Sequence, residues 1–110
     1  MNTRVESSRL GRYEGLRLAY TVQLHQEGHR ISGTGRKISE NDRRINPRAQ
    51  TPIALEGVLS GDRVELTFTE QGRLRPSTGT LLLARESDDA LRGRFFSNAA
   101  ESSGVVEIRR

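Results

Sequence analysis

Seven short runs of alternating apolar and polar residues, separated by breaks that contain Gly or Asp, extend along most of this 110-residue chain. Side chains of an extended strand alternate between two faces, so each run predicts a strand with one apolar face. The runs cover residues 16–24, 30–39, 52–59, 63–69, 78–85, 91–97 and 105–109. Short strands at near-regular spacing, joined by tight turns, are typical of an antiparallel up-and-down meander, and such a meander must close or pack to hide its edges.

We therefore predict an all-β fold, an antiparallel up-and-down meander closed into a small barrel of about eight strands. An eighth strand would come from a bend in residues 12–24, for instance at Gly15. A barrel of about eight strands has an interior that is filled by side chains or holds one small ligand. A barrel of five or six strands, or an open sandwich, is the alternative. Helix signals are weak, and residues 40–48 are the only segment that suits a helix.

The length of the chain allows one domain with a single modest core. Residues 1–9 are too polar to order themselves by burial, so we expect a flexible tail or a linker remnant there and a single barrel domain over residues 10–110. The sequence has no apolar stretch near the roughly 20 residues of a membrane-spanning helix and no apolar signal segment. Because Cys is absent, a reducing compartment fits. We expect a cytoplasmic protein, or the cytoplasmic domain of a membrane-anchored one.

Positive charge is concentrated in the first half of the chain. The formal net charge is +4, but residues 1–50 hold ten basic and five acidic side chains, whereas residues 51–110 hold eight and nine. This asymmetry indicates a positive surface for an anionic partner. The one long break, residues 40–51, lies in this half, and loops of that length tend to be functional or disordered.

Basic residues in and around the long break are the best functional candidates. Guanidinium groups pair bidentately with phosphate, and a loop beside a barrel mouth can fold over a ligand. The alternative is that these are solvated charges that discourage pairing of strand edges. Nucleic acid is a weaker candidate partner, because the net charge is modest and surface aromatics for stacking are few. The residues that we expect to bind a small anionic ligand are Tyr13, Tyr20, Arg36, Arg43, Arg44 and Arg48.

No catalytic or metal-binding constellation is evident. His25 and His29 flank a predicted turn, and no Cys or carboxylate cluster completes a metal site around them. Glu70 and the pair Asp88 and Asp89 fall in predicted turns, where such side chains are solvated. We therefore expect no enzyme activity, no cofactor and no metal.

Two glycines that resemble part of a phosphate-binding loop have a different interpretation. Gly33 and Gly35 lack the third glycine and the following helix of a nucleotide fingerprint. Glycines within a strand usually mark a bend or a close backbone approach. We predict that they form a corner of the barrel.

The strand pattern, with Gly11-Arg12-Tyr13 near its start and later glycines near strand starts or bends (Gly57, Gly79, Gly93 and Gly104), resembles the calycin-type barrels of lipocalins and avidins. Those proteins often begin with Gly-x-Trp, and here Tyr13 takes the place of Trp. The resemblance covers about residues 10–110 and implies a ligand-binding meander barrel.

The segments 31–35, 53–68 and 91–95, followed by Gly104 and Ile108-Arg109, resemble the compact β-barrel sensor domain of CBASS-type antiphage membrane effectors. This resemblance implies binding of a cyclic oligonucleotide messenger in bacterial antiphage defence. Members of that family carry transmembrane helices ahead of the barrel, which this sequence lacks. The resemblance therefore implies either an excised domain or a likeness between two barrels only.

Our leading functional hypothesis is a non-enzymatic barrel that binds a small anionic ligand, such as a cyclic dinucleotide or oligonucleotide, and relays occupancy through self-association. The alternative is an interaction or structural module without a small ligand. Its outer apolar surface, Leu82 and Phe96 by strand parity, would dock a partner or a second copy.

Overall fold

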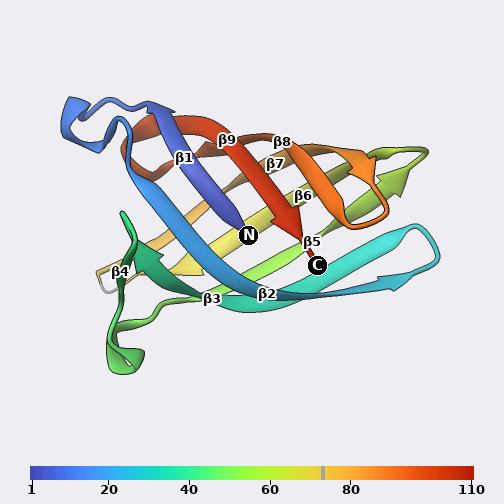
Figure 1. The fold of residues 1–110 in the computed structure, drawn as a ribbon, viewed down its shortest axis with the longest axis horizontal. Helices are drawn as coiled ribbons and strands as arrows, with labels where there is room; N and C mark the ends of the chain where they lie inside the picture. The colour runs from blue at the N-terminus through green and yellow to red at the C-terminus, as the bar shows by residue number, and fades with distance from the viewer. Residues whose placement is uncertain (73) are drawn as a thin grey trace.

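Within the described residues, 1–72 and 74–110, eight antiparallel strands close into a barrel in the order in which they follow one another along the chain (Figure 1). Each barrel strand pairs with the next, and the last pairs with the first. The computed structural model thus confirms the predicted meander barrel, and all seven runs are strands. The strands are β1 (Asn2–Ser7), β2 (Arg17–Glu27), β3 (Arg30–Glu40), β5 (Pro52–Ser60), β6 (Arg63–Gln71), β7 (Pro76–Ser87), β8 (Ala90–Ser97) and β9 (Ser102–Arg109).

The remaining elements are short. A two-residue strand, β4 (Arg43–Arg44), lies beside β3 outside the barrel wall. The helical segments of the described chain are single 3-10 turns, η1 (Gly11–Tyr13), η2 (Pro47–Ala49) and η3 (Ala99–Glu101). None of these turns has the length or the apolar character needed to cross a membrane.

The eighth strand comes from the segment that we expected to be a flexible tail. β1 pairs with both β2 and β9, and Val5 is buried at 4% exposure. The Val5 N–H donates to the Leu16 carbonyl at 2.9 Å, and the Gly15 N–H donates to the Val5 carbonyl at 2.7 Å. Main-chain hydrogen bonds of this kind do not depend on apolar side chains, so the polar composition hid the strand. The barrel therefore includes β1, and the predicted bend of residues 12–24 into two strands was wrong.

Inward-facing glycines let neighbouring strands approach closely at the corners of the barrel. A Cβ added to Gly57 of β5 would overlap the carbonyl oxygen of Glu65 on β6. A Cβ added to Gly35 of β3 would overlap the carbonyl oxygen of Thr21 on β2 in the same way. Small barrels need such glycines to bend their strands, and the interpretation of the β3 glycines as corner residues agrees with these contacts.

The two ends of the barrel differ. The tight turns that join β2 to β3, β5 to β6 and β7 to β8 lie at one end, at the right in Figure 1. The longer connections, with η1, η2 and η3, lie at the left. Aliphatic side chains fill the interior between them, and Leu66, Leu81 and Val106 are almost completely buried. The end with the longer connections is the open one, because residues of these connections line a cavity there.

Replacing Gly57 by Ala should lower the free energy of unfolding by about 1–3 kcal/mol, because the added methyl group has no room against the β6 backbone. Gly11→Ala is the matched control, since nothing lies within 4 Å of a Cβ at that position. Urea unfolding followed by circular dichroism measures both variants. Equal stabilities for the two variants would contradict the close approach at Gly57.

Candidate functional site

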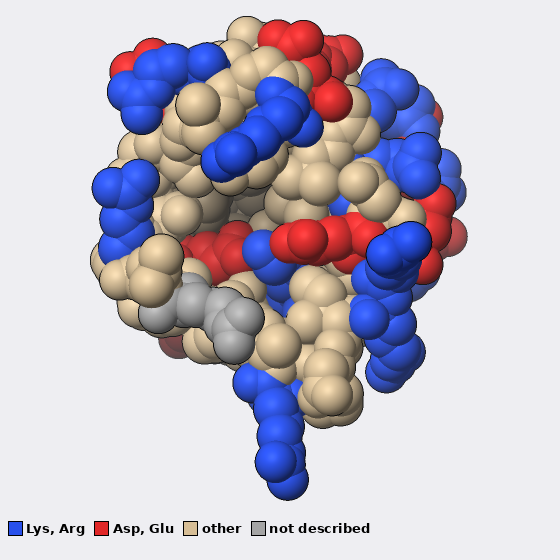
Figure 2. All heavy atoms as spheres, turned by 90° about the vertical axis from the view of Figure 1, so that its left-hand side faces the viewer, with Lys and Arg blue, Asp and Glu red and all other residues tan. Residues whose placement is uncertain are grey.

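A cavity of about 580 Å³ opens at the end of the barrel where the longer connections gather. Figure 2 views the molecule from that end and shows the hollow, with acidic and basic side chains along its lower edge and basic side chains above it and to its left. Each of the eight barrel strands contributes a lining residue, as do η1 and η3. Ligand-binding pockets commonly have volumes of about 300–1,000 Å³, so the cavity has the size of a small-molecule site.

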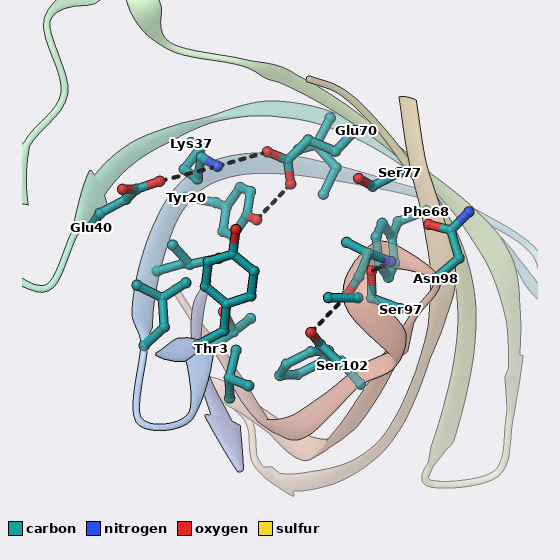
Figure 3. Close-up of a pocket in the computed structure, with 18 of the residues that line it drawn as sticks. Thr3, Tyr20, Lys37, Glu40, Phe68, Glu70, Ser77, Ser97, Asn98 and Ser102 are labelled. Carbon is teal, nitrogen blue, oxygen red and sulfur yellow. Dashed lines mark hydrogen bonds and ion pairs between the residues drawn. The ribbon is translucent and has the colours of Figure 1, made fainter. Parts of the chain in front are cut away.

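Glu70 of β6 is the centre of a polar network on one side of the cavity (Figure 3). The Tyr20 hydroxyl donates to Glu70 Oε1 at 2.7 Å, and the Thr51 hydroxyl donates to Glu70 Oε2 at 2.7 Å. Lys37 Nζ lies 3.1 Å from Glu70 Oε2 and 3.5 Å from Glu40 Oε1. The side chains of Glu70 and Lys37 are only 12% and 17% exposed. Both oxygens of the buried carboxylate therefore have partners, which a buried charge requires.

The alternation of β6 places Glu70 inside the barrel. Val64 and Leu66 are buried at alternate positions of this strand, and continuing the alternation through Phe68 makes Glu70 the next inward residue. Our expectation that Glu70 is a solvated turn residue was wrong, because β6 continues to Gln71. An acidic residue in phase with an apolar face is the signal that would have identified it.

Lys37 of β3 lies on the same side of the cavity. It faces inward by the same alternation, two positions after Gly35. It belongs to the basic residues in and around the long break. Its ammonium group is turned into the cavity between two carboxylates. Lys37 therefore offsets one of the two negative charges beside it.

The hydroxyl of Tyr20 is held in its neutral form. Burial raises the pKa of Tyr20 well above its ordinary value, and the charge of Glu70 and the hydrogen bond to it raise this pKa further. Tyr20 therefore remains a hydrogen-bond donor to Glu70 at neutral pH, in agreement with its predicted place on the core face.

Neutral polar groups near η3 form the opposite wall of the cavity. The Ser102 hydroxyl donates to the Ala99 carbonyl at 2.7 Å, and the Ser97 hydroxyl accepts from the Ala99 N–H at 3.1 Å. Asn98 uses its Oδ1 to accept the Thr78 N–H at 2.9 Å, which leaves its amide NH₂ group as a donor. Hydroxyl and amide groups are therefore present to orient a ligand against this wall.

Positive charge at the cavity is greatest at its mouth. Among the described lining residues, the charged side chains are Arg9, Lys37 and Arg75 against Glu40 and Glu70, a formal balance of +1. Because Lys37 lies between the two carboxylates, the remaining positive charge belongs to the two exposed arginines. Arg9 is 64% exposed and lies 3.9 Å from the Glu101 carboxylate, a loose ion pair. The mouth therefore offers guanidinium groups to a ligand.

The predicted ligand-binding residues fall into two groups. Tyr13 and Tyr20 line the cavity. The predicted arginines are exposed, on the outer side of β3, in β4 and in η2, and a role for them in ligand binding stays a prediction. Those four residues are Arg36, Arg43, Arg44 and Arg48.

Sequence reasoning missed Arg9 and Arg75 at the mouth. Neither residue is part of an alternating run, since Arg9 precedes η1 and Arg75 lies between β6 and β7. Only the paths of these connections bring the two arginines to the same cavity.

Tyr20→Phe should lower the free energy of unfolding by about 2 kcal/mol, because it removes the donor to a buried carboxylate oxygen. The control is Tyr13→Phe. Among the described residues, the Tyr13 hydroxyl accepts one exposed hydrogen bond, from Arg12 at 3.3 Å. Its removal should change the free energy of unfolding by less than about 0.5 kcal/mol. Chemical denaturation of both variants gives the comparison. A loss no greater for Tyr20→Phe than for Tyr13→Phe would be inconsistent with the network.

The ionisation of Tyr20 should be coupled to unfolding. In Tyr13→Phe, Tyr20 is the only tyrosine, and the chain has no Trp. Because the folded pKa of Tyr20 is raised, its contribution to stability is complete below the ordinary pKa of about 10 and is lost as the pH rises above it. Tyrosinate absorbance should therefore appear together with the loss of circular dichroism. A separate titration near the ordinary pKa, with the fold intact, would contradict this.

The chain matches no protein-family model, no curated protein and no solved structure at a significant level. The small closed antiparallel barrel is compatible with the calycin-type architecture.

Proposed function

We propose that the protein is a non-enzymatic binding barrel whose cavity takes a small ligand with an anionic group. The observation that carries this proposal is the open cavity of about 580 Å³ in a barrel whose other half is filled by aliphatic side chains. A barrel without a ligand has no need of such a hollow, since side chains alone can fill an interior of this width.

The distribution of charge in the cavity supports an anionic group at the mouth. Arg9 and Arg75 are exposed there, and guanidinium groups bind phosphate or carboxylate bidentately. The side of the cavity that carries Glu70 favours hydrogen-bond donors on another part of the ligand, because Glu40 and Glu70 outnumber Lys37. Phe68 and Tyr13 supply aromatic surface between these regions. An anionic molecule with a flat body and amino or imino donors suits this arrangement.

The composition of the lining supports binding without catalysis. Among its described residues there is no Cys or His. Glu70 is engaged by Tyr20, Thr51 and Lys37 at once, so it belongs to a structural network and is not a free general base. His25 and His29 lie at the turn between β2 and β3, at the other end of the barrel.

The specific form of the proposal is a cyclic dinucleotide or oligonucleotide messenger, as in CBASS-type antiphage sensors. Such a ligand has phosphates for arginines and flat bases with donor groups for tyrosines and carboxylates. In this form, occupancy of the cavity is relayed through self-association of the barrel.

Isothermal calorimetry with cyclic di-GMP, cyclic di-AMP and cyclic GMP-AMP tests the proposal. At least one of the three should bind, and the double variant Arg9→Ala/Arg75→Ala should weaken it about tenfold or more, since each charged hydrogen bond to an anion contributes about 1.5–3 kcal/mol. The matched control is Arg63→Ala, an exposed arginine at the end with the tight turns. It should leave the affinity unchanged.

The same titrations separate the two groups of arginines. The triple variant Arg43→Ala/Arg44→Ala/Arg48→Ala should bind like the parent if the cavity mouth holds the anion. A loss confined to the triple variant would move the anion site to the connection between β3 and β5. No heat with any of the three messengers would overturn the cyclic-nucleotide form.

A second candidate function, an interaction module without a small ligand, is favoured by one observation. Leu82 of β7 and Phe96 of β8 are 46% and 45% exposed on the outer face of neighbouring strands. Exposed apolar side chains on adjacent strands suit the docking of a partner or a second copy. The variant Leu82→Lys, included in the self-association experiment below, tests this surface.

A further inference from the structure

The distal part of β2 has a strand partner on one side only, as far as the described residues show. On one side β2 pairs with β3 from Leu18 to its end at Glu27. On the other side β1 pairs with residues 17–19. The last contact along this side is at Tyr20, whose N–H donates to the Met1 carbonyl at 2.7 Å and whose carbonyl accepts from the Met1 amino group at 2.8 Å.

Antiparallel pairing shows which main-chain groups lie on the open side. Alternate residues of a strand direct both their N–H and C=O groups toward the same neighbour. Because Tyr20 directs its groups toward β1, Val22, Leu24 and Gln26 direct theirs toward the same side, where the described chain places no strand. The residues between them bond to β3 instead. The edge therefore presents three N–H and three C=O groups in the spacing that an added strand requires.

The side chain of Leu24 agrees with an uncovered edge. It is in phase with Tyr20, which is 7% exposed, but Leu24 is 37% exposed. An inward-facing leucine keeps that exposure when no neighbouring strand covers it. In Figure 1 the hairpin of β2 and β3 projects to the right, clear of the ribbon of β9. Exposed edges of this kind template pairing with another strand.

We propose that this edge, residues 22–26 of β2, pairs with the same edge of a second copy about a two-fold axis at Leu24. In this register Leu24 lies opposite Leu24 of the second copy, and Val22 lies opposite Gln26. Every main-chain group on the edge then finds a partner, in the isologous manner that closes a dimer. The two Leu24 side chains cover each other.

The charges along the edge permit a second copy as the occupant. With the axis at Leu24, Gln23 lies opposite His25 and Thr21 lies opposite Glu27, so no like charges face each other over residues 21–27. Like charges directly opposite are destabilising in antiparallel pairs. The edge is thus complementary to itself in hydrogen bonding and apolar contact, and no like charges oppose this pairing.

Sedimentation velocity over micromolar to millimolar concentrations tests the dimer. The parent chain should pass from monomer to dimer, and Leu24→Lys should raise the dimer dissociation constant about tenfold or more, because an inward-pointing lysine on an edge blocks pairing. Leu82→Lys is the matched control, a similarly exposed leucine on the outer face of β7. It should dimerise like the parent. Circular dichroism checks that both variants remain folded.

Amide hydrogen exchange of the parent chain provides a test that needs no variant. The amides of Val22, Leu24 and Gln26 should be protected only at concentrations where the dimer forms. Those of Thr21 and Gln23 should be protected at all concentrations, because they bond to β3.

Three results would overturn this proposal, and none of them bears on the cavity. One is a monomer at every concentration. Another is a dimer in which exchange at the three edge amides does not change. The third is a dimer that Leu82→Lys disrupts and Leu24→Lys does not, which would assign the interface to the outer face that carries Leu82 and Phe96.

Discussion

Closure of the sheet by pairing of β9 with β1 is the constraint on which the rest of this structure depends. A sheet of eight strands that closes on itself has a narrow interior, and corner glycines such as Gly57 allow the strands to bend that far. At the end with tight turns, alternating aliphatic side chains fill this interior. At the other end the same narrow wall surrounds a cavity with a charged network on one side. The closure of eight strands therefore sets the width of both the filled core and the cavity.

The buried ion pair of Glu70 and Lys37 is better explained by the properties that it gives the cavity than by a contribution to folding stability. Replacing a buried ion pair by well-packed apolar side chains is often neutral or stabilising. Glu70 and Lys37 nevertheless lie in the barrel with partners for both carboxylate oxygens. The result is a polar surface on one side of the cavity, beside a positively charged mouth. Such a surface discriminates among ligands by their hydrogen-bonding groups.

The alternation of apolar and polar residues with a period of two predicted most of the fold. It predicted seven strands, the buried place of Tyr20 and the outward places of Leu82 and Phe96. β1 escaped this pattern, because its place depends on main-chain bonds to β2 and β9. Glu70 escaped it because an acidic residue after an apolar run was interpreted as the start of a turn. Arg9 also lines the cavity. It lies in a connection, and an alternating pattern does not predict the path of a connection.

The difference between the two ends of the barrel has a consequence for how such a protein changes over time. The connections between β1 and β2 and between β8 and β9 line the cavity and lie outside the barrel ladder. Insertions and substitutions there leave the strand register intact, whereas the tight turns at the opposite end tolerate little change. A lineage of this barrel is free to acquire new ligands by exchanging those connections, with the same eight strands inherited unchanged beneath them.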